Sequence, residues 1–109
     1  MAIKRRKRKK MGIRKGPPSY PGHMKWVRGN ECCVALHGSL CVGKMHAHHV
    51  KTKGAGGLDN QTVPLCGFHH GELHTIGRQS FDNKYSVNLT NLAEEYARVS
   101  PHRLKWEEE

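Results

Sequence analysis

The chain has 109 residues, a net charge of +10 and a hydrophobic fraction of only 36%. This length corresponds to one domain, and the low apolar content excludes a large buried core. No apolar segment is long enough to span a membrane. A domain with so small a core usually needs disulfides or a structural metal ion to stabilise it.

The first 18 residues carry nine Lys or Arg residues and no acid. A run of like charges repels itself and cannot form a core, so a disordered tail and linker are predicted over residues 1–22. We favour a nucleic-acid-binding arm that displaces counterions from phosphates, although a solubilising leader or a nuclear-localisation signal would have the same composition. The residues expected to bind phosphates are Lys4, Arg5, Arg6, Lys7, Arg8, Lys9, Lys10, Arg14 and Lys15.

The following segment, residues 23–100, is predicted to be the folded body. A short helix is expected at residues 23–29, and a strand in KMHAHHV, residues 44–50. KTKGAGGLDNQT, residues 51–62, has the composition of a long loop. LCGFHHGELHTIG is expected to form a knuckle that leads into a helix ending at Gly77.

The last predicted element of the body is a supporting helix in NLTNLAEEYARV. Its apolar residues recur with helical spacing, and Asn88 is a suitable N-cap. Residues 101–109 are expected to be a C-terminal tail that begins at Pro101.

Histidines and aromatic residues outside these patterns are assigned to the surface or to the core, without a functional role. His23 and His102 are expected at the surface, whereas Trp26, Phe68 and Phe81 are expected in the core.

The cysteines predict a structural zinc site. Cys66 and His69 have the C-x2-H spacing of a zinc knuckle, and further cysteines lie upstream. No signal peptide is recognised, so we expect a reducing cytoplasm, in which such cysteines bind metal rather than form disulfides. The expected ligands are Cys32, Cys41, Cys66 and His69, with Cys33 an alternative to Cys32 and His37 a substitute ligand.

Six of the nine histidines lie between residues 46 and 74. His70 and His74 are four residues apart, so on a helix they share one face and can bind one ion. His48 and His49 would point to opposite sides of a strand, so that one binds the ion and the other faces a substrate. A three-ligand set of His48, His70 and His74 would leave open positions, as catalytic metal sites do.

The segments AHHV, GAGG, DN and VPLCGFHHGELH, in this order, resemble the HNH nucleases, also called ββα-metal or His-Me finger endonucleases. The likeness covers roughly residues 26–96 and is nearest to phage and prophage members, including recombination-enhancement nucleases. It implies an α+β fold in which residues 23–100 form a small ββα-metal domain with a zinc knuckle and a C-terminal supporting helix.

The resemblance also implies roles for individual residues. His48, His70 and His74 would bind a catalytic Mg²⁺, Mn²⁺ or Zn²⁺, beside a structural Zn²⁺ on the cysteines. His49 would be the general base, for which a neutral imidazole is suited at physiological pH. Asn60 would hold the loop or orient His49 through a hydrogen bond to its ring.

The sequence therefore predicts a metal-dependent endonuclease that hydrolyses phosphodiester bonds in DNA. The alternative is a non-catalytic, zinc-stabilised DNA-binding module, which would have no use for His49; a histidine-rich metal buffer would not explain the ordered spacing. DNA is the expected partner, without a membrane, in the cytoplasm of a bacterium or a phage-infected cell. The sequence contains no segment typical of a recognition helix, so cleavage is expected to be weakly sequence-specific or directed by a partner.

Overall fold

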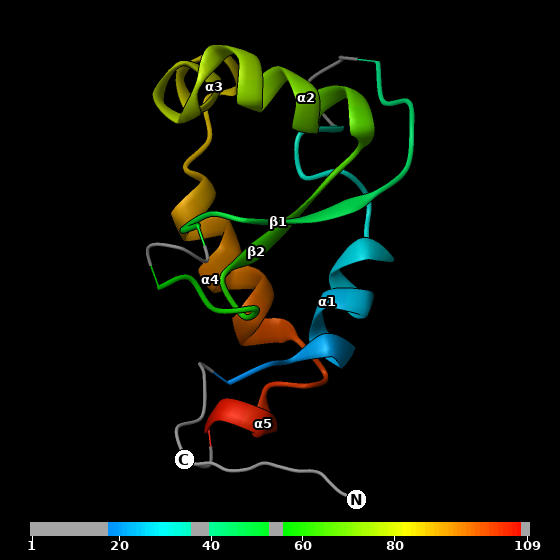
Figure 1. Ribbon diagram of the computed structural model, residues 1–109, viewed down its shortest axis with the longest axis vertical. Coiled ribbons are helices and arrows are strands. Elements are labelled where there is room, and N and C mark those ends of the chain that lie inside the picture. The colour runs from blue at the N-terminus through cyan, green and yellow to red at the C-terminus, as the bar shows by residue number, and fades with distance from the viewer. Residues whose placement is uncertain (1–17, 36–39, 53–55, 108–109) are drawn as a thin grey trace, which may run out of the picture.

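A two-stranded antiparallel ribbon lies at the centre of the fold (Figure 1). The computed structural model describes residues 18–107 except 36–39 and 53–55. Strand β1 (His46–His49) pairs with strand β2 (Thr62–Leu65), His46 opposite Leu65 and His49 opposite Thr62. The result is a small, compact α+β structure, as the sequence predicts.

Five helices surround the ribbon in the described part of the chain. Helices α2 (Gly67–Ile76) and α3 (Arg78–Tyr85) lie at one end of the molecule, and α5 (Leu104–Glu107) lies at the other (Figure 1). Helix α1 (Pro21–Arg28) contacts both strands, and α4 (Leu89–Val99) contacts β2.

The pairing register divides the ribbon into two faces. Residues directly opposite each other present their side chains on the same face. His48 is opposite Val63, which lies with Leu65 in a buried cluster that also contains Leu73 of α2 and Leu89 of α4. His48 therefore belongs to the face that packs against α2, and the neighbouring side chain on β1 belongs to the other face.

Helices α2 and α4 begin as the sequence predicts. The Sγ atom of Cys66 accepts a hydrogen bond from the backbone N–H of His69, and Oδ1 of Asn88 accepts one from the N–H of Asn91. Side-chain acceptors at these positions satisfy N–H groups that have no partner within the helix. Gly77, at φ 88°, ends α2, since this region of backbone conformation favours glycine.

The sequence did not predict helix α3, which begins directly after Gly77. Its sequence, RQSFDNKY, is mostly polar, so the spacing of Phe81 and Tyr85 is its only apolar signal. These two residues, one turn apart, are 0% and 4% exposed and belong to the main hydrophobic cluster. Two anchors on one face are enough to hold a short helix whose other residues face solvent.

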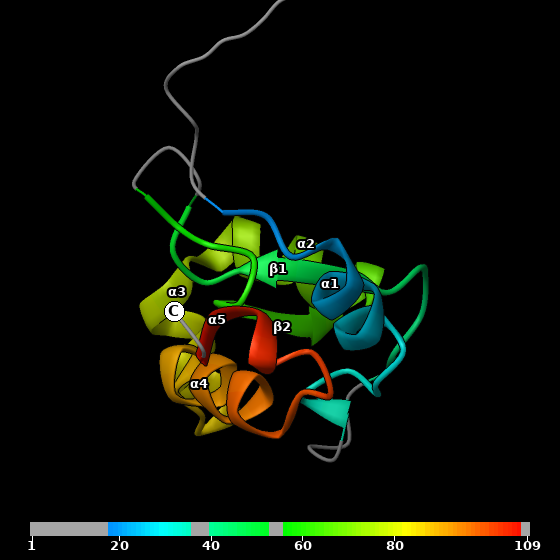
Figure 2. The ribbon, with the colours of Figure 1, turned by 90° about the horizontal axis from the view of Figure 1, so that it is seen from below.

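The two ends of the described chain pack on the body, contrary to the expected boundaries at residues 22 and 101. Helix α1 begins at Pro21, inside the segment expected to be linker. In the expected C-terminal tail, α5 lies below α1 and α4 in Figure 1 and between them in Figure 2. The Trp106 ring is 5.0 Å from the ring of Tyr20 and 5.0 Å from that of His23, centroid to centroid.

Three of the assignments to the surface or to the core require correction. His23, expected at the surface, is fully buried, with Nδ1 2.8 Å from Oγ of Ser100, and His102 is half-buried against Gly22. Phe68, expected in the core, is 46% exposed, because its position in the first turn of α2 faces away from the ribbon. Phe81 is buried as expected, and Trp26 is half-buried.

No helix in the described ranges has the length and apolar character needed to cross a membrane.

Burial of His23 makes the folding stability depend on pH. Its pKa is lowered from 6.5 to about 4, first by burial and then by the neighbouring His102, while Asp59 acts in the opposite direction. Between these two pH values the unfolded chain binds a proton that the folded chain does not. Stability is therefore present above pH 6.5 and is lost as the pH falls towards 4.

We expect His23→Gln to remove this dependence. Because all other histidines are the same in both proteins, the difference in unfolding free energy between wild type and variant isolates His23. That difference should shrink by up to roughly 3 kcal/mol between pH 7 and pH 4, at about 1.4 kcal/mol per pKa unit. Urea titrations at several pH values measure it, and a constant difference would contradict the assignment.

Candidate metal centres

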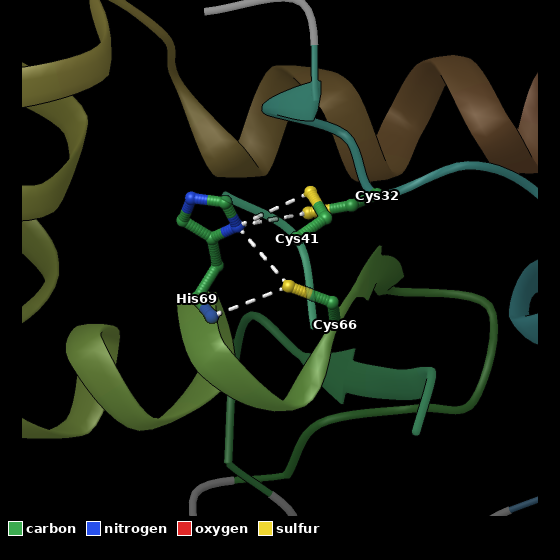
Figure 3. Close-up of side chains that lie close together, drawn as sticks. All are labelled: Cys32, Cys41, Cys66 and His69. Carbon is green, nitrogen blue, oxygen red and sulfur yellow. Dashed lines mark hydrogen bonds between the residues drawn. The ribbon is translucent and has the colours of Figure 1, made fainter. Parts of the chain in front are cut away.

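Three cysteines converge on one nitrogen of His69 (Figure 3). The Nδ1 atom of His69 is 3.5 Å from Sγ of Cys32, 3.6 Å from Sγ of Cys41 and 3.1 Å from Sγ of Cys66. Tetrahedral zinc, with bonds of about 2.3 Å to sulfur and 2.0–2.1 Å to nitrogen, requires sulfur–nitrogen separations of about 3.6 Å. The four ligand atoms lie within 4.8 Å of one another. This Cys3His cluster can therefore hold a metal ion such as zinc.

The cluster is assembled from three separate parts of the chain. Cys32 follows α1, Cys41 precedes β1, and Cys66 and His69 belong to the start of α2. The segment that carries Cys41 is attached to α2 by a hydrogen bond of 3.0 Å from the N–H of Phe68 to the carbonyl of Val42. A Cβ on Gly43 would lie 3.2 Å from Cα of Gly67, so a glycine at this position permits the close approach.

Burial and neighbouring groups shift the pKa values of several side chains in the Cys3His cluster. Although Cys41 as a whole residue is exposed, the partial withdrawal of its thiol from water and then the neighbouring Cys32 raise its pKa to about 12. Burial also opposes ionisation of Cys66, but hydrogen bonds, the first from the backbone N–H of His69, lower its pKa overall. Burial lowers the pKa of His69, which favours the neutral imidazole that binds metal. Zinc binding at such a site displaces the thiol protons.

The geometry distinguishes Cys32 from Cys33, which the sequence left open. Cys33 does not belong to the cluster; it packs against the hydrophobic core, and burial raises its pKa to about 12. None of the four cysteines forms a disulfide. The substitute ligand considered from the sequence, His37, lies outside the described residues.

The second cluster consists of His48 on β1 with His70 and His74 on α2. Nε2 of His70 is 3.2 Å from Nδ1 of His48 and 3.1 Å from Nε2 of His74. Nitrogen ligands about 2.05 Å from a tetrahedral ion are about 3.3 Å apart. The three rings converge as a set of metal ligands would.

His48 and His70 favour the neutral, metal-binding form. The pKa of His48 is lowered to about 4 by burial first and then by His70 and His74. The pKa of His70 is lowered by burial and by the neighbouring His74 and His46. The His46 ring lies 4.8 Å from that of His70, but its nitrogens are not among those that converge.

The two clusters differ in ligand number and access. In the Cys3His cluster four ligands complete a tetrahedron, and all but Cys41 are buried. The histidine cluster supplies three ligands, of which His74 is exposed and the other two are half-buried. Four protein ligands are typical of structural zinc, whereas three leave positions for water or substrate.

His49 lies on the opposite face of β1 from these ligands, and its ring contacts a carboxylate. Its Nε2 atom is 2.9 Å from Oδ1 of Asp59. The ring nitrogen faces Asp59 rather than Asn60, whose Oδ1 atom is buried without a hydrogen-bond partner among the described residues. The other role expected for Asn60, holding the loop, stays a prediction. Asp59 was not predicted as a partner of His49, because nothing in the sequence DN shows which of the two side chains faces β1.

The loop that carries Asp59 folds back towards the end of β1. The N–H of Gly57 donates to the carbonyl of Thr52 at 2.8 Å, and the N–H of Val50 donates to that of Gln61 at 2.9 Å. A Cβ on Gly57 would lie 1.7 Å from the carbonyl oxygen of Lys51, so only glycine fits here. The nine expected phosphate-binding residues between Lys4 and Lys15 lie outside the described residues.

No protein-family model matches the chain, and no curated protein or solved structure matches it significantly.

We expect purified protein to retain one zinc ion per chain through a mild chelator wash, on the Cys3His cluster. Cys66→Ser should lose this ion together with cooperative thermal unfolding, because zinc binding at such sites contributes on the order of 10 kcal/mol to folding. Metal analysis and calorimetry measure both effects.

The matched control is Cys33→Ser, which leaves the four ligands intact and should keep the zinc. Metal-free protein that unfolds at the wild-type temperature with the same cooperativity would disprove the structural role. Loss of zinc in Cys33→Ser but not in Cys32→Ser would disprove the ligand assignment.

Proposed function

We propose that the chain is a metal-dependent endonuclease of the HNH family that hydrolyses phosphodiester bonds in DNA. The observation that carries the proposal is the three-histidine cluster, open on one side, on a strand–strand–helix unit made of β1, β2 and α2. One ligand comes from the first strand and two from the helix, with a Cys3His cluster at the helix N-terminus. This arrangement supports the resemblance noted in the sequence.

The ligand chemistry favours a particular class of ion. Imidazole nitrogens suit zinc and other transition metals, whereas magnesium and manganese prefer carboxylate and water oxygens. Since His48, His70 and His74 supply no oxygen, Zn²⁺ is favoured among the three ions considered. A bound ion would polarise the phosphate and stabilise the leaving oxygen as a Lewis acid.

His49 supplies the remaining group that hydrolysis needs. It follows the ligand His48 directly on β1, its side chain is 17% exposed, and Asp59 holds one of its ring nitrogens. The second ring nitrogen of a neutral histidine can accept the proton of an attacking water. A carboxylate that orients a histidine is typical of general-base pairs, as in the hydrolase triads.

The basic N-terminal segment would supply affinity for DNA. Its nine Lys and Arg residues can neutralise phosphates without reading the base sequence. The alternative function is a DNA-binding module stabilised by zinc alone, which the Cys3His cluster and the basic segment would suffice to explain. That module gives no role to the histidine cluster or to the His49–Asp59 pair.

We expect His49→Ala to cleave supercoiled plasmid about 10²–10⁴ times more slowly than wild type, because a positioned base is lost. Zinc content, folding and DNA affinity should be retained, since His49 does not belong to either cluster. Time courses of nicked and linear product measure the rate. His74→Ala should instead weaken metal binding, so that excess metal partly restores cleavage.

The matched control is His102→Ala, which removes a histidine that belongs to neither metal cluster and should cleave at the wild-type rate. A His49→Ala protein as active as wild type would exclude His49 as the base. Wild-type protein that binds DNA but cuts it with none of Zn²⁺, Mn²⁺, Co²⁺ or Mg²⁺ would favour the non-catalytic module.

Deletion of residues 1–15 should weaken DNA binding and flatten its dependence on salt. Each phosphate contact contributes about 0.9 to the slope of log affinity against log salt concentration, so losing several contacts lowers the slope by several units. Titrations of labelled duplex at four salt concentrations measure it, with zinc content as the control for folding. An unchanged slope would exclude this segment as a phosphate-binding arm.

A further inference from the structure

Asp59 connects the candidate base to the start of the described chain. Its side chain is 5% exposed. Oδ1 lies 2.9 Å from Nε2 of His49, while Oδ2 accepts hydrogen bonds from the backbone N–H of Tyr20 at 3.0 Å and from the hydroxyl of Ser19 at 3.3 Å. Each carboxylate oxygen therefore has its own partners.

We infer that Asp59 is a positioning residue that fixes the His49 ring with its proton on Nε2, which leaves Nδ1 as the nitrogen that accepts a proton. The role of this nitrogen in catalysis rests on the proposed endonuclease function.

The argument follows from the bonding capacity of the two groups. An ionised carboxylate can only accept hydrogen bonds, so the His49 nitrogen that faces Oδ1 must carry a hydrogen. A neutral imidazole has one donor and one acceptor nitrogen. With Nε2 as the donor, the lone pair is on Nδ1. If the ring instead faced Asn60, whose amide can both donate and accept, neither ring nitrogen would be required to carry the proton.

The surroundings make Asp59 a rigid acceptor. Its carbonyl accepts a 3.0 Å hydrogen bond from Oγ1 of the buried Thr62 on β2. The turn that contains it is closed by two hydrogen bonds between Leu58 and Gln61, of 2.8 and 2.9 Å. Because Asp59 and His49 are both largely withdrawn from water, their hydrogen bond is stronger than one at the surface.

A different role would be purely structural, with the pair only attaching the loop to β1. A positioning role requires one tautomer of the His49 ring, whereas a purely structural contact does not. The tautomer can be measured without an activity assay. Nitrogen NMR of histidine-labelled, zinc-loaded full-length protein distinguishes a protonated Nε2 from a protonated Nδ1. This measurement on wild type requires no variant to fold.

We expect His49 in wild type to carry its proton on Nε2. In Asp59→Asn the amide can donate to Nε2, so the proton should move towards Nδ1. The kcat for plasmid cleavage should then fall about 10²–10⁴-fold, as when a triad carboxylate is replaced by its amide, with little change in KM or zinc content. Ser19→Ala, which removes one bond to Oδ2 but leaves the His49 contact, should keep both the tautomer and the kcat.

A proton on Nδ1 of His49 in wild type would overturn the inference. So would an Asp59→Asn protein with the wild-type tautomer and wild-type kcat. A loss of activity in which KM and zinc content change as much as kcat would show that Asp59 is only structural. If wild type does not cleave DNA with any metal, the proposed function fails, and the tautomer alone then decides whether Asp59 controls the His49 ring.

Discussion

The convergence of three cysteine sulfurs on Nδ1 of His69 is the interaction on which the rest of the structure depends. Cys66 takes part twice, since its sulfur faces this nitrogen and also caps the helix by accepting the His69 N–H. An ion held here would fix both the start and the direction of α2. Successive helix residues point about 100° apart. The same ion would therefore aim His70, the next residue, towards His48 on β1.

The small size of the core is the physical reason to expect that a bound metal stabilises the fold. Among the described residues, ten form the main buried cluster, and two of them are the candidate ligands Cys32 and Cys66. Domains are stable by only about 5–15 kcal/mol, and zinc binding at a four-ligand site is of similar magnitude. A zinc ion on the Cys3His cluster would stabilise the fold and leave the three-histidine cluster, formed by β1 and the first two turns of α2, free for the proposed chemistry.

Short-range sequence patterns predicted many of the helices and strands. The features that they did not predict depend on contacts between residues far apart in the sequence. The Cys66–His69 spacing, the Asn88 cap and the adjacent histidines on β1 are short-range patterns set by backbone geometry, and the structure places them as expected. The burial of His23 depends on Ser100, 77 residues away, and on α5. No periodicity within a segment can show such a contact. Asp59 was missed for the same reason: a loop carboxylate is usually solvated, and here two distant segments enclose it.

The alternation of side chains along β1 places His48 and His49 on opposite faces, where the proposed function gives them different tasks. His48 faces α2 and the other histidines of the cluster. Protonated rings there would repel one another and any metal ion, so this face can bind a cation only when the rings are neutral. His49 faces the loop, where Oδ1 of Asp59 lies 2.9 Å from Nε2 of its ring. Had both rings shared a face, Asp59 would compete with the ion for the same nitrogens. In the proposed function, the period of the strand thus lets one short segment bind metal on one side and hold the base on the other.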